Sequence, residues 1–326
     1  MTDLPSLSRR HVLLGGIVAA ACGSAGVRAQ VAPGDETVAL WPGAIPGARG
    51  ARITRSIDDQ SHGKGPLDRF VKGIDRPVLV VRRPATPTGA AVLILPGGGY
   101  EFLSYDNEGT SQAAWLAARG ITSFTLLYRL PGEGWNDRAV VPLQDAQRAM
   151  RVIRAGAGRF GVDPAKVAVL GFSAGGHLAG SLATRFDERV YAPVDAADRL
   201  SARPDLAGLL YPVVSMVAPF SHPGSRDALL GADAPDALRR AASVELRVTA
   251  DTSPTFLAHA GDDGLVPVAN SIALYTALLA QGRPAELHAF DRGGHGFGVR
   301  PPASVPAGHW PELFHRFGAS RGVFSG

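Results

Sequence analysis

Short apolar runs alternate along the chain with stretches in which apolar residues recur every three or four positions. The runs are bounded by glycine, proline or aspartate, which is typical of buried strands. They predict strands at 90–95, 121–128, 166–170, 206–214, 255–259 and 285–290. The periodic stretches predict helices at 112–119, 142–154 and 268–280, the last with Val268, Ile272, Tyr275 and Leu279 along one apolar stripe.

Strands that alternate with helices and are apolar on both faces predict a mainly parallel sheet with helices on both sides. The expected fold class is therefore α/β. Ligand sites in such sheets lie beyond the carboxyl ends of the strands, and the polar motifs of this chain follow predicted strands at those ends. No internal repeat or long charge run divides residues 30–326, so we expect them to form one domain.

The first 29 residues have the pattern of an export signal. Arg9 and Arg10 precede an apolar run from Val12 to Ala21, and a small-residue pattern ends at Ala29. This arrangement is typical of twin-arginine export, so we expect a periplasmic or secreted protein. The run is shorter than the roughly 20 apolar residues that span a bilayer, so we expect no stable membrane span. The only cysteine, Cys22, lies in this segment, and lipid attachment there is the alternative.

The charge of the chain argues against a nucleic-acid partner. The formal net charge is +4, and half of it comes from the first 29 residues, in which three arginines face one aspartate. Sequence-independent binding to nucleic acid needs a concentrated set of cationic side chains that neutralise phosphates. In the rest of the chain, basic and acidic residues are nearly equal in number, which does not favour binding to nucleic acid.

A glycine-flanked serine follows the predicted strand at 166–170. The segment Gly171-Phe172-Ser173-Ala174-Gly175 has the G-x-S-x-G pattern of a nucleophile elbow and precedes an alanine-rich helical segment. The turn must be sharp enough to expose the hydroxyl, which brings the backbone too close for a Cβ at the two glycines. Ser173 is the candidate nucleophile.

A serine hydroxyl becomes nucleophilic only beside a general base, which a carboxylate must orient. Among nine histidines, His295 is the candidate base because it stands in a glycine-rich loop after the last predicted strand. We interpret His177 and His259 as packing or site-supporting residues, and His288, His309 and His315 as structural or exposed.

Two adjacent acids follow the strand at 255–259. Asp263 is favoured as the orienting carboxylate because it stands three residues before Val266-Pro267, where the next helix begins, and Asp262 is the alternative. The acid that does not orient the base is expected to cap that helix. The order Ser173, Asp263, His295 is that of the α/β-hydrolase fold.

The loop Pro96-Gly97-Gly98-Gly99-Tyr100 follows the strand at 90–95 and is similar to an HGGG-type oxyanion loop, with proline in place of histidine. We predict that the backbone N–H groups of Gly98, Gly99 and Ala174 form an oxyanion hole. The loop does not match a phosphate loop, since no lysine and serine follow at Walker spacing. We predict no cofactor and no metal.

Further motifs extend this pattern. The chain resembles bacterial esterases related to acetylxylan esterases, from about Leu40 to its end, in the motifs Asn107-Glu108-Gly109, Pro142-Leu-Gln-Asp145-Ala146, Phe160-Gly-Val-Asp163-Pro164 and Tyr211-Pro-Val-Val-Ser215-Met216. Close relatives of that family include feruloyl esterases and general carboxylesterases. The resemblance implies the α/β-hydrolase fold, a Ser173, Asp263, His295 triad, an oxyanion hole at Gly98, Gly99 and Ala174, no cofactor, and export.

We therefore expect a serine carboxylesterase that hydrolyses short-chain acyl esters, acetyl esters above all, of small molecules or of carbohydrates such as xylan. The stretches 185–203 and 219–254 are expected to shape its pockets. One alternative is a serine exopeptidase of the same fold, which usually carries an additional propeller or cap. Another is a non-catalytic binding protein, which normally lacks a triad member. The sequence does not determine the natural ester or the oligomeric state.

Overall fold

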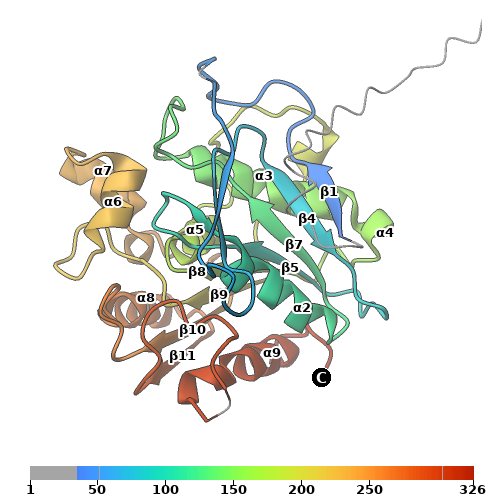
Figure 1. The fold of residues 1–326 in the computed structure, drawn as a ribbon, viewed down its shortest axis with the longest axis vertical. Helices are drawn as coiled ribbons and strands as arrows, with labels where there is room; N and C mark the ends of the chain where they lie inside the picture. Colours follow the sequence, from blue (N-terminus) through green and yellow to red (C-terminus); the bar gives the residue numbers. More distant parts are fainter. Residues whose placement is uncertain (1–34, 51, 303) are drawn as a thin grey trace, which may run out of the picture. The chain divides into compact units, whose positions relative to one another are not determined.

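An eight-stranded sheet runs through the part of the chain that the computed structural model describes, residues 35–50, 52–302 and 304–326 (Figure 1). These residues belong to one compact unit, Ala32–Gly326. The predicted export signal and Cys22 lie outside the described residues. No helix in the described ranges combines the length and the apolar character that crossing a bilayer requires.

The order of the strands is that of a largely parallel sheet. From one edge to the other they are β1 (Glu36–Ala39), β4 (Val78–Arg82), β7 (Thr122–Leu127), β5 (Ala91–Leu95), β8 (Val167–Phe172), β9 (Leu206–Leu210), β10 (Thr255–Ala260) and β11 (Ala285–Phe290). β4 is antiparallel to β1 and β7, and the pairs from β7 to β11 are parallel. The predicted α/β class is confirmed.

Register brings the sequence motifs together at the carboxyl ends of the strands. Leu95 at the end of β5 pairs with Gly171 in β8, so the glycine loop after β5 lies beside the turn at Ser173. Ala260 at the end of β10 pairs with Phe290 at the end of β11, which places the acidic loop beside the loop that carries His295. This edge of the sheet is where ligand sites of parallel α/β proteins form.

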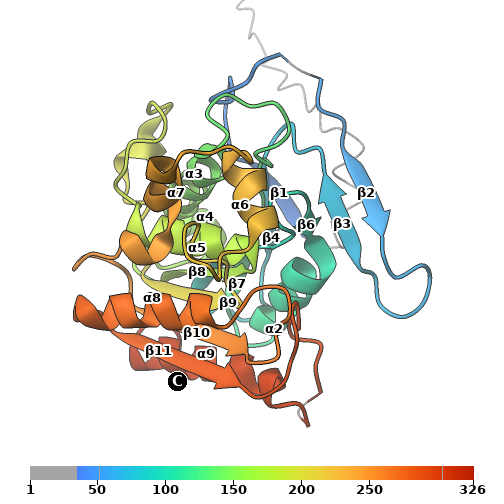
Figure 2. The same cartoon turned by 90° about the vertical axis from the view of Figure 1, so that its left-hand side faces the viewer.

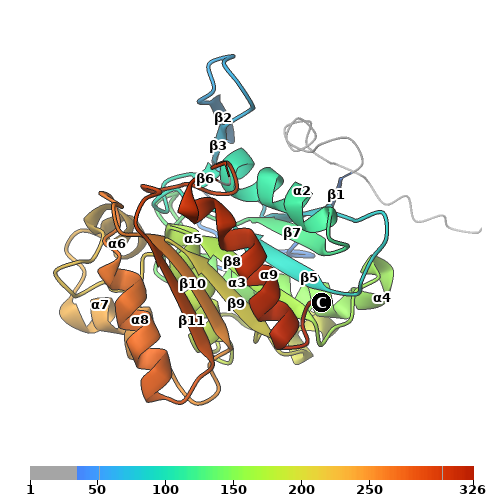
Figure 3. The ribbon, with the colours of Figure 1, turned by 90° about the horizontal axis from the view of Figure 1, so that it is seen from below.

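Helices cover both faces of the sheet (Figure 3). α2 (Ser111–Ala117) and α9 (Trp310–Ser320) share one buried cluster, in which Leu116, Phe314 and Phe317 pack with Ile94 and Phe256 of the strands. The opposite face carries α3 (Val141–Ala155), α5 (Ala174–Thr184) and α8 (Ala269–Ala280). The central strands are therefore removed from water on both sides, which explains the continuous apolar runs of β5, β8 and β9, whereas the edge strands β1 and β11 are only partly buried.

Smaller elements surround the site. A three-stranded sheet of β2 (Ser56–Asp59), β3 (Arg69–Lys72) and β6 (Leu103–Ser104) stands beside the large one (Figure 2). A π-helical turn, η1 (Asp106–Thr110), leads into α2. The remaining α-helices of the described residues are α4 (Ala157–Phe160), α6 (Pro223–Leu230) and α7 (Asp236–Ala242).

The strand predicted at 206–214 is shorter than expected. β9 ends at Leu210 because Tyr211 takes a positive φ of 37° and Pro212 follows it. β1 and β4 were not predicted at all. The apolar run from Val78 to Val81 is the signal that could have revealed β4.

The stripe predicted for the helix at 268–280 is wrong. Ile272 and Leu279 are 48% and 52% exposed, whereas Asn270 and Ser271 are fully buried. The polar pair is buried because the Asn270 side-chain oxygen accepts hydrogen bonds from the backbone N–H groups of Val214 and Ser215, and Ser271 bonds to a histidine of β10. The helix therefore buries these hydrogen-bonded polar side chains and leaves Ile272 and Leu279 of the predicted stripe exposed.

Candidate active site

Ser173 sits in a strained turn between β8 and α5. Its φ of 52° and ψ of −119° lie in a region that non-glycine residues rarely adopt. A Cβ at Gly171 would lie 2.2 Å from the Gly175 carbonyl oxygen, and one at Gly175 would lie 2.1 Å from the Leu95 carbonyl oxygen. Both flanking positions therefore require glycine, as the sequence predicts, Gly171 because of the turn itself and Gly175 because the end of β5 lies against it. The turn directs the serine side chain out of the sheet edge.

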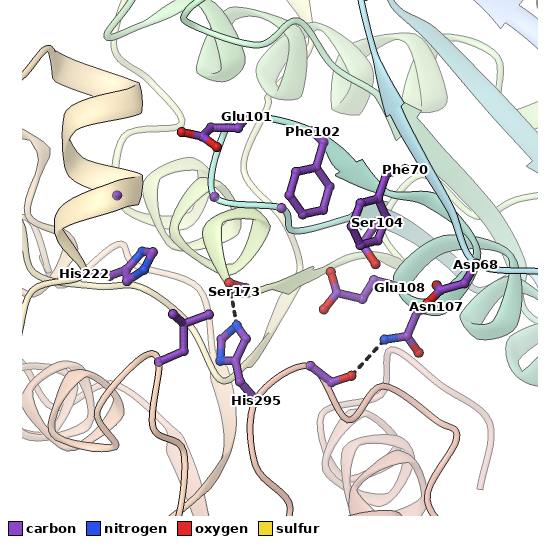
Figure 4. A pocket seen from close by; sticks show the side chains of 15 residues that line it. Asp68, Phe70, Glu101, Phe102, Ser104, Asn107, Glu108, Ser173, His222 and His295 are labelled. Atoms are coloured by element: carbon purple, nitrogen blue, oxygen red, sulfur yellow. Dashed lines mark hydrogen bonds between the residues drawn. The ribbon is translucent and has the colours of Figure 1, made fainter. Parts of the chain in front are cut away.

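Three predicted site residues form one chain of hydrogen bonds. Ser173 Oγ lies 2.9 Å from His295 Nε2 (Figure 4), and His295 Nδ1 lies 2.7 Å from Asp263 Oδ2. A carboxylate can only accept, so Nδ1 donates its proton to Asp263, and Nε2 is left to accept the Ser173 hydroxyl proton. This arrangement can make the serine oxygen a nucleophile.

Asp262 and Asp263 have different partners. Asp262 Oδ1 accepts the backbone N–H groups of Gly293 and Gly294 at 2.9 and 2.8 Å, which holds the loop that carries His295. The expectation that the second acid caps the following helix is therefore wrong. Oδ1 of Asp263 accepts the backbone N–H groups of Leu265 and Val266, which precede α8, while Oδ2 lies against His295.

A second histidine supports the same carboxylate. His259 Nε2 lies 3.2 Å from Asp263 Oδ2 and 2.9 Å from the Val266 carbonyl oxygen, so this nitrogen carries a proton and donates. Burial of Asp263 favours its neutral form, but the hydrogen bonds from His259, His295 and Val266 outweigh burial and hold the pKa of Asp263 well below its usual value. The carboxylate is therefore fixed as an anion.

The predicted oxyanion residues present free donors near Ser173. Gly98 and Gly99 line the same cavity as Ser173, and Ala174 begins α5. Within the described residues, the backbone N–H groups of Gly98, Gly99 and Ala174 donate to no protein group. Gly98 has a φ of 124°, and a Cβ there would lie 2.2 Å from the Phe102 carbonyl oxygen, so the loop requires glycine.

Glu108 was missed as a site residue by the motif reasoning. Its side chain is buried against the glycine loop, where Oε2 accepts the Gly97 N–H at 2.7 Å and Oε1 accepts the Tyr211 hydroxyl at 2.8 Å. Burial raises the pKa of Glu108, and these two hydrogen bonds partly oppose that rise. The motif Asn107-Glu108-Gly109 marked the position only through family resemblance. The hydrogen bond that Glu108 accepts from the Gly97 N–H holds the start of the predicted oxyanion loop.

The cavity above Ser173 has a volume of about 350 Å³. One wall carries the stacked rings of Phe70 and Phe102, whose centroids lie 4.1 Å apart (Figure 4). The stretch 219–254 contributes His222 and Gly224 to the lining, as expected. The stretch 185–203 contributes nothing to the lining of this cavity, so that expectation is wrong.

The other histidines of the described chain occupy varied settings. His177 is fully buried between the Tyr100 hydroxyl and the Ala242 carbonyl oxygen, each 2.8 Å from a ring nitrogen. His259 supports Asp263, as its interpretation as a site-supporting residue anticipates. His315 stacks on Phe324. No group of three His, Cys, Asp or Glu side chains in the described ranges is placed to hold a metal ion.

The sheet order, the strained serine turn and the Ser, His and Asp hydrogen-bond chain together define an α/β-hydrolase fold with a site of the serine-hydrolase type. A family model, BD-FAE, matches residues 82–278, and the chain belongs to that family of α/β-hydrolase esterases.

Known proteins with similar sequences and structures are esterases or xylan-degrading enzymes. An acetylxylan esterase of Xylanibacter ruminicola is 34% identical over 66% of this chain and 42% of its own length. Endo-1,4-beta-xylanase B of Butyrivibrio fibrisolvens is 36% identical over 64% of this chain and 32% of its own. The chain thus spans less than half the length of these two relatives. The acetyl ester-xyloside bifunctional hydrolase of Caldicellulosiruptor lactoaceticus is 33% identical, with a TM-score of 0.73 over 89% of this chain and 97% of that one.

Proposed function

We propose that this protein is a serine carboxylesterase that removes short acyl groups, acetyl above all, from small-molecule or carbohydrate alcohols. The observation that carries the proposal is the hydrogen-bond chain from Asp263 through His295 to Ser173. The serine at the end of this chain lies in the same cavity as Gly98 and Gly99 and next to Ala174, whose backbone N–H groups are free to bind a substrate oxygen.

The proposed reaction is a two-step acyl transfer. His295 Nε2 takes the hydroxyl proton as Ser173 Oγ attacks the ester carbonyl carbon, and the N–H groups of Gly98, Gly99 and Ala174 stabilise the negative oxygen of the tetrahedral intermediate. His295 then gives the proton to the leaving alcohol. Water, activated by the same imidazole, attacks the acyl-serine and releases the carboxylic acid. Asp263 keeps the imidazole in the required tautomer throughout.

The names of the relatives support an acetyl ester substrate, with xylan as the candidate polysaccharide. None of the three named relatives is described as a peptidase, so nothing found favours the exopeptidase alternative. The proposal includes export of the chain through its twin-arginine segment, with residues 30–326 as the catalytic domain, and this part rests on the sequence pattern alone.

Replacement of Ser173 by alanine tests the proposal. Hydrolysis of p-nitrophenyl acetate, butyrate and octanoate and release of acetate from acetylated xylan are measured for the parent and for Ser173→Ala. We expect kcat to fall by roughly 10⁴–10⁶ with an unchanged circular dichroism spectrum. Ser201→Ala is the matched control, since Ser201 is exposed and outside the cavity lining. Substantial ester turnover by a folded Ser173→Ala variant would contradict the assignment.

A further inference from the structure

His222 lines the cavity but has no part in the proposed acyl transfer. It immediately precedes α6, and its half-buried ring faces the space beside Ser173 and His295 (Figure 4). The side chain belongs to a segment far along the sequence from both residues. Its role therefore depends on what its ring nitrogens can offer to a bound molecule.

Two hydrogen bonds fix the proton of this ring. His222 Nδ1 accepts the backbone N–H of Ser225 at 3.1 Å and lies 2.8 Å from the Ser225 hydroxyl oxygen. A backbone N–H can only donate, so Nδ1 carries no proton and the neutral ring carries its proton on Nε2. A second proton on Nδ1 would break the bond from the Ser225 N–H. The ring therefore offers one donor, Nε2–H.

The charged form of His222 is also opposed by its surroundings. Burial lowers the pKa of His222, and so does the neighbouring His295, while the carboxylates of Asp263 and Glu101 act in the opposite direction. The lowered pKa and the hydrogen bond that Nδ1 accepts from the Ser225 N–H both favour a neutral imidazole beside the cavity.

The Nε2–H group of His222 faces the cavity without a hydrogen-bond partner in the described part of the chain. Among the described residues, no group accepts a hydrogen bond from it. When a substrate displaces water from the cavity, a donor left without an acceptor loses the hydrogen bond it made to water, which costs binding energy. A substrate that supplies an acceptor at this point avoids that loss.

We propose that His222 Nε2 donates a hydrogen bond to an oxygen in the alcohol portion of the ester, a hydroxyl or an ether oxygen. This inference rests on the proposed esterase function. An acetyl ester has two oxygens of its own: the carbonyl oxygen faces the oxyanion N–H groups, and the ester oxygen must receive a proton from His295. A further acceptor therefore belongs to the alcohol. The cavity also presents Asp68 and Glu101, whose carboxylates accept hydrogen bonds from hydroxyl groups, so it suits polyhydroxylated alcohols.

The test uses two variants that separate the functions of the two ring nitrogens. His222→Asn keeps an acceptor for the Ser225 N–H at the start of α6 but does not reach the position of Nε2. His222→Gln places an amide N–H donor near that position. The substrates are the monoacetate of trans-1,2-cyclohexanediol and cyclohexyl acetate, which differ by one hydroxyl group. His309→Asn is the histidine control outside the cavity lining.

We expect the kcat/KM ratio of the hydroxylated to the plain ester to fall about threefold to tenfold in His222→Asn and to recover in His222→Gln. An unchanged ratio in a folded His222→Asn, with the parent hydrolysing both esters, overturns the inference and leaves the esterase function intact. A loss that follows a change from acetate to propionate instead of the hydroxyl group overturns the assignment to the alcohol side.

A readout independent of turnover separates this inference from the proposed function. Long-range ¹⁵N–¹H NMR of the imidazole reports the tautomer, and a proton on Nδ1 of His222 would overturn the inference. If the parent hydrolyses no ester, the proposed function fails. A shift of the His222 Nε2 resonance on addition of trans-1,2-cyclohexanediol would then still support the donor role, and no shift would refute it.

Discussion

Asp263→Asn is the substitution for which the structure gives the sharpest expectation. Asp263 accepts four hydrogen bonds: Oδ2 faces His295 Nδ1 at 2.7 Å and His259 Nε2 at 3.2 Å, and Oδ1 faces the N–H groups of Leu265 and Val266 at 2.9 Å each. An asparagine has one oxygen. If the amide NH₂ faces the histidines, His295 can move its proton to Nε2 and accept from it, but His259 Nε2, which donates to the Val266 carbonyl oxygen, remains an opposed donor.

The cost of this mismatch follows from burial. The Asp263 side chain has no exposed surface, so an unsatisfied donor there costs about 1–3 kcal/mol. We expect the free energy of unfolding to fall by about 1–3 kcal/mol for the one donor, His259 Nε2, that remains opposed. We expect kcat to fall about 10⁴-fold, because the amide no longer holds His295 with its proton on Nδ1.

Asp262→Asn is the matched control for this experiment. Asp262 is exposed, and its Oδ1 alone accepts from Gly293 and Gly294, so an asparagine oxygen can replace it. We expect unfolding free energy to change by less than about 0.5 kcal/mol. Both variants are compared by urea unfolding and by p-nitrophenyl acetate kinetics. A folded Asp263→Asn variant within tenfold of parent kcat, or an equal loss in Asp262→Asn, would refute the reasoning.

Two further predictions concern buried groups around the site. Burial lowers the pKa of His177 to about 4. As the pH falls, the unfolded state therefore binds a proton before the folded state does. The contribution of His177 to the free energy of unfolding is highest above pH 6.5, and about 3 kcal/mol of it is lost between pH 6.5 and pH 4. Urea unfolding at pH 7 and 4 should show a correspondingly smaller loss in His177→Gln, and an equal loss would contradict this. Glu108→Ala removes the acceptor of both the Gly97 N–H and the Tyr211 hydroxyl, so we expect kcat toward p-nitrophenyl acetate to fall roughly tenfold. An unchanged kcat in a folded variant would show that these hydrogen bonds do not position the predicted oxyanion loop.

The sequence predicts those parts of this protein that depend on local patterns. The central strands β5, β8 and β9 appear as short apolar runs because both faces of the sheet are covered there and every residue of these strands is buried. The turn at Ser173 can also be predicted from a local pattern, the glycines at 171 and 175. Gly171 avoids the Gly175 carbonyl oxygen within the same five residues, so that steric requirement is visible in the local sequence, whereas Gly175 avoids the Leu95 carbonyl oxygen at the end of β5.

Tertiary structure alone decided the features that depend on contacts between distant segments. Sequence spacing favours Asp263 over its neighbour Asp262, but the contacts of both acids depend on the position of the loop at 293–295, which Asp262 holds and whose His295 Asp263 meets. The buried face of α8 depends on Asn270 finding backbone donors at Val214 and Ser215. A polar side chain faces solvent or the interior according to whether a hydrogen-bond partner is within reach, and the folded chain rather than the adjacent residues supplies that partner.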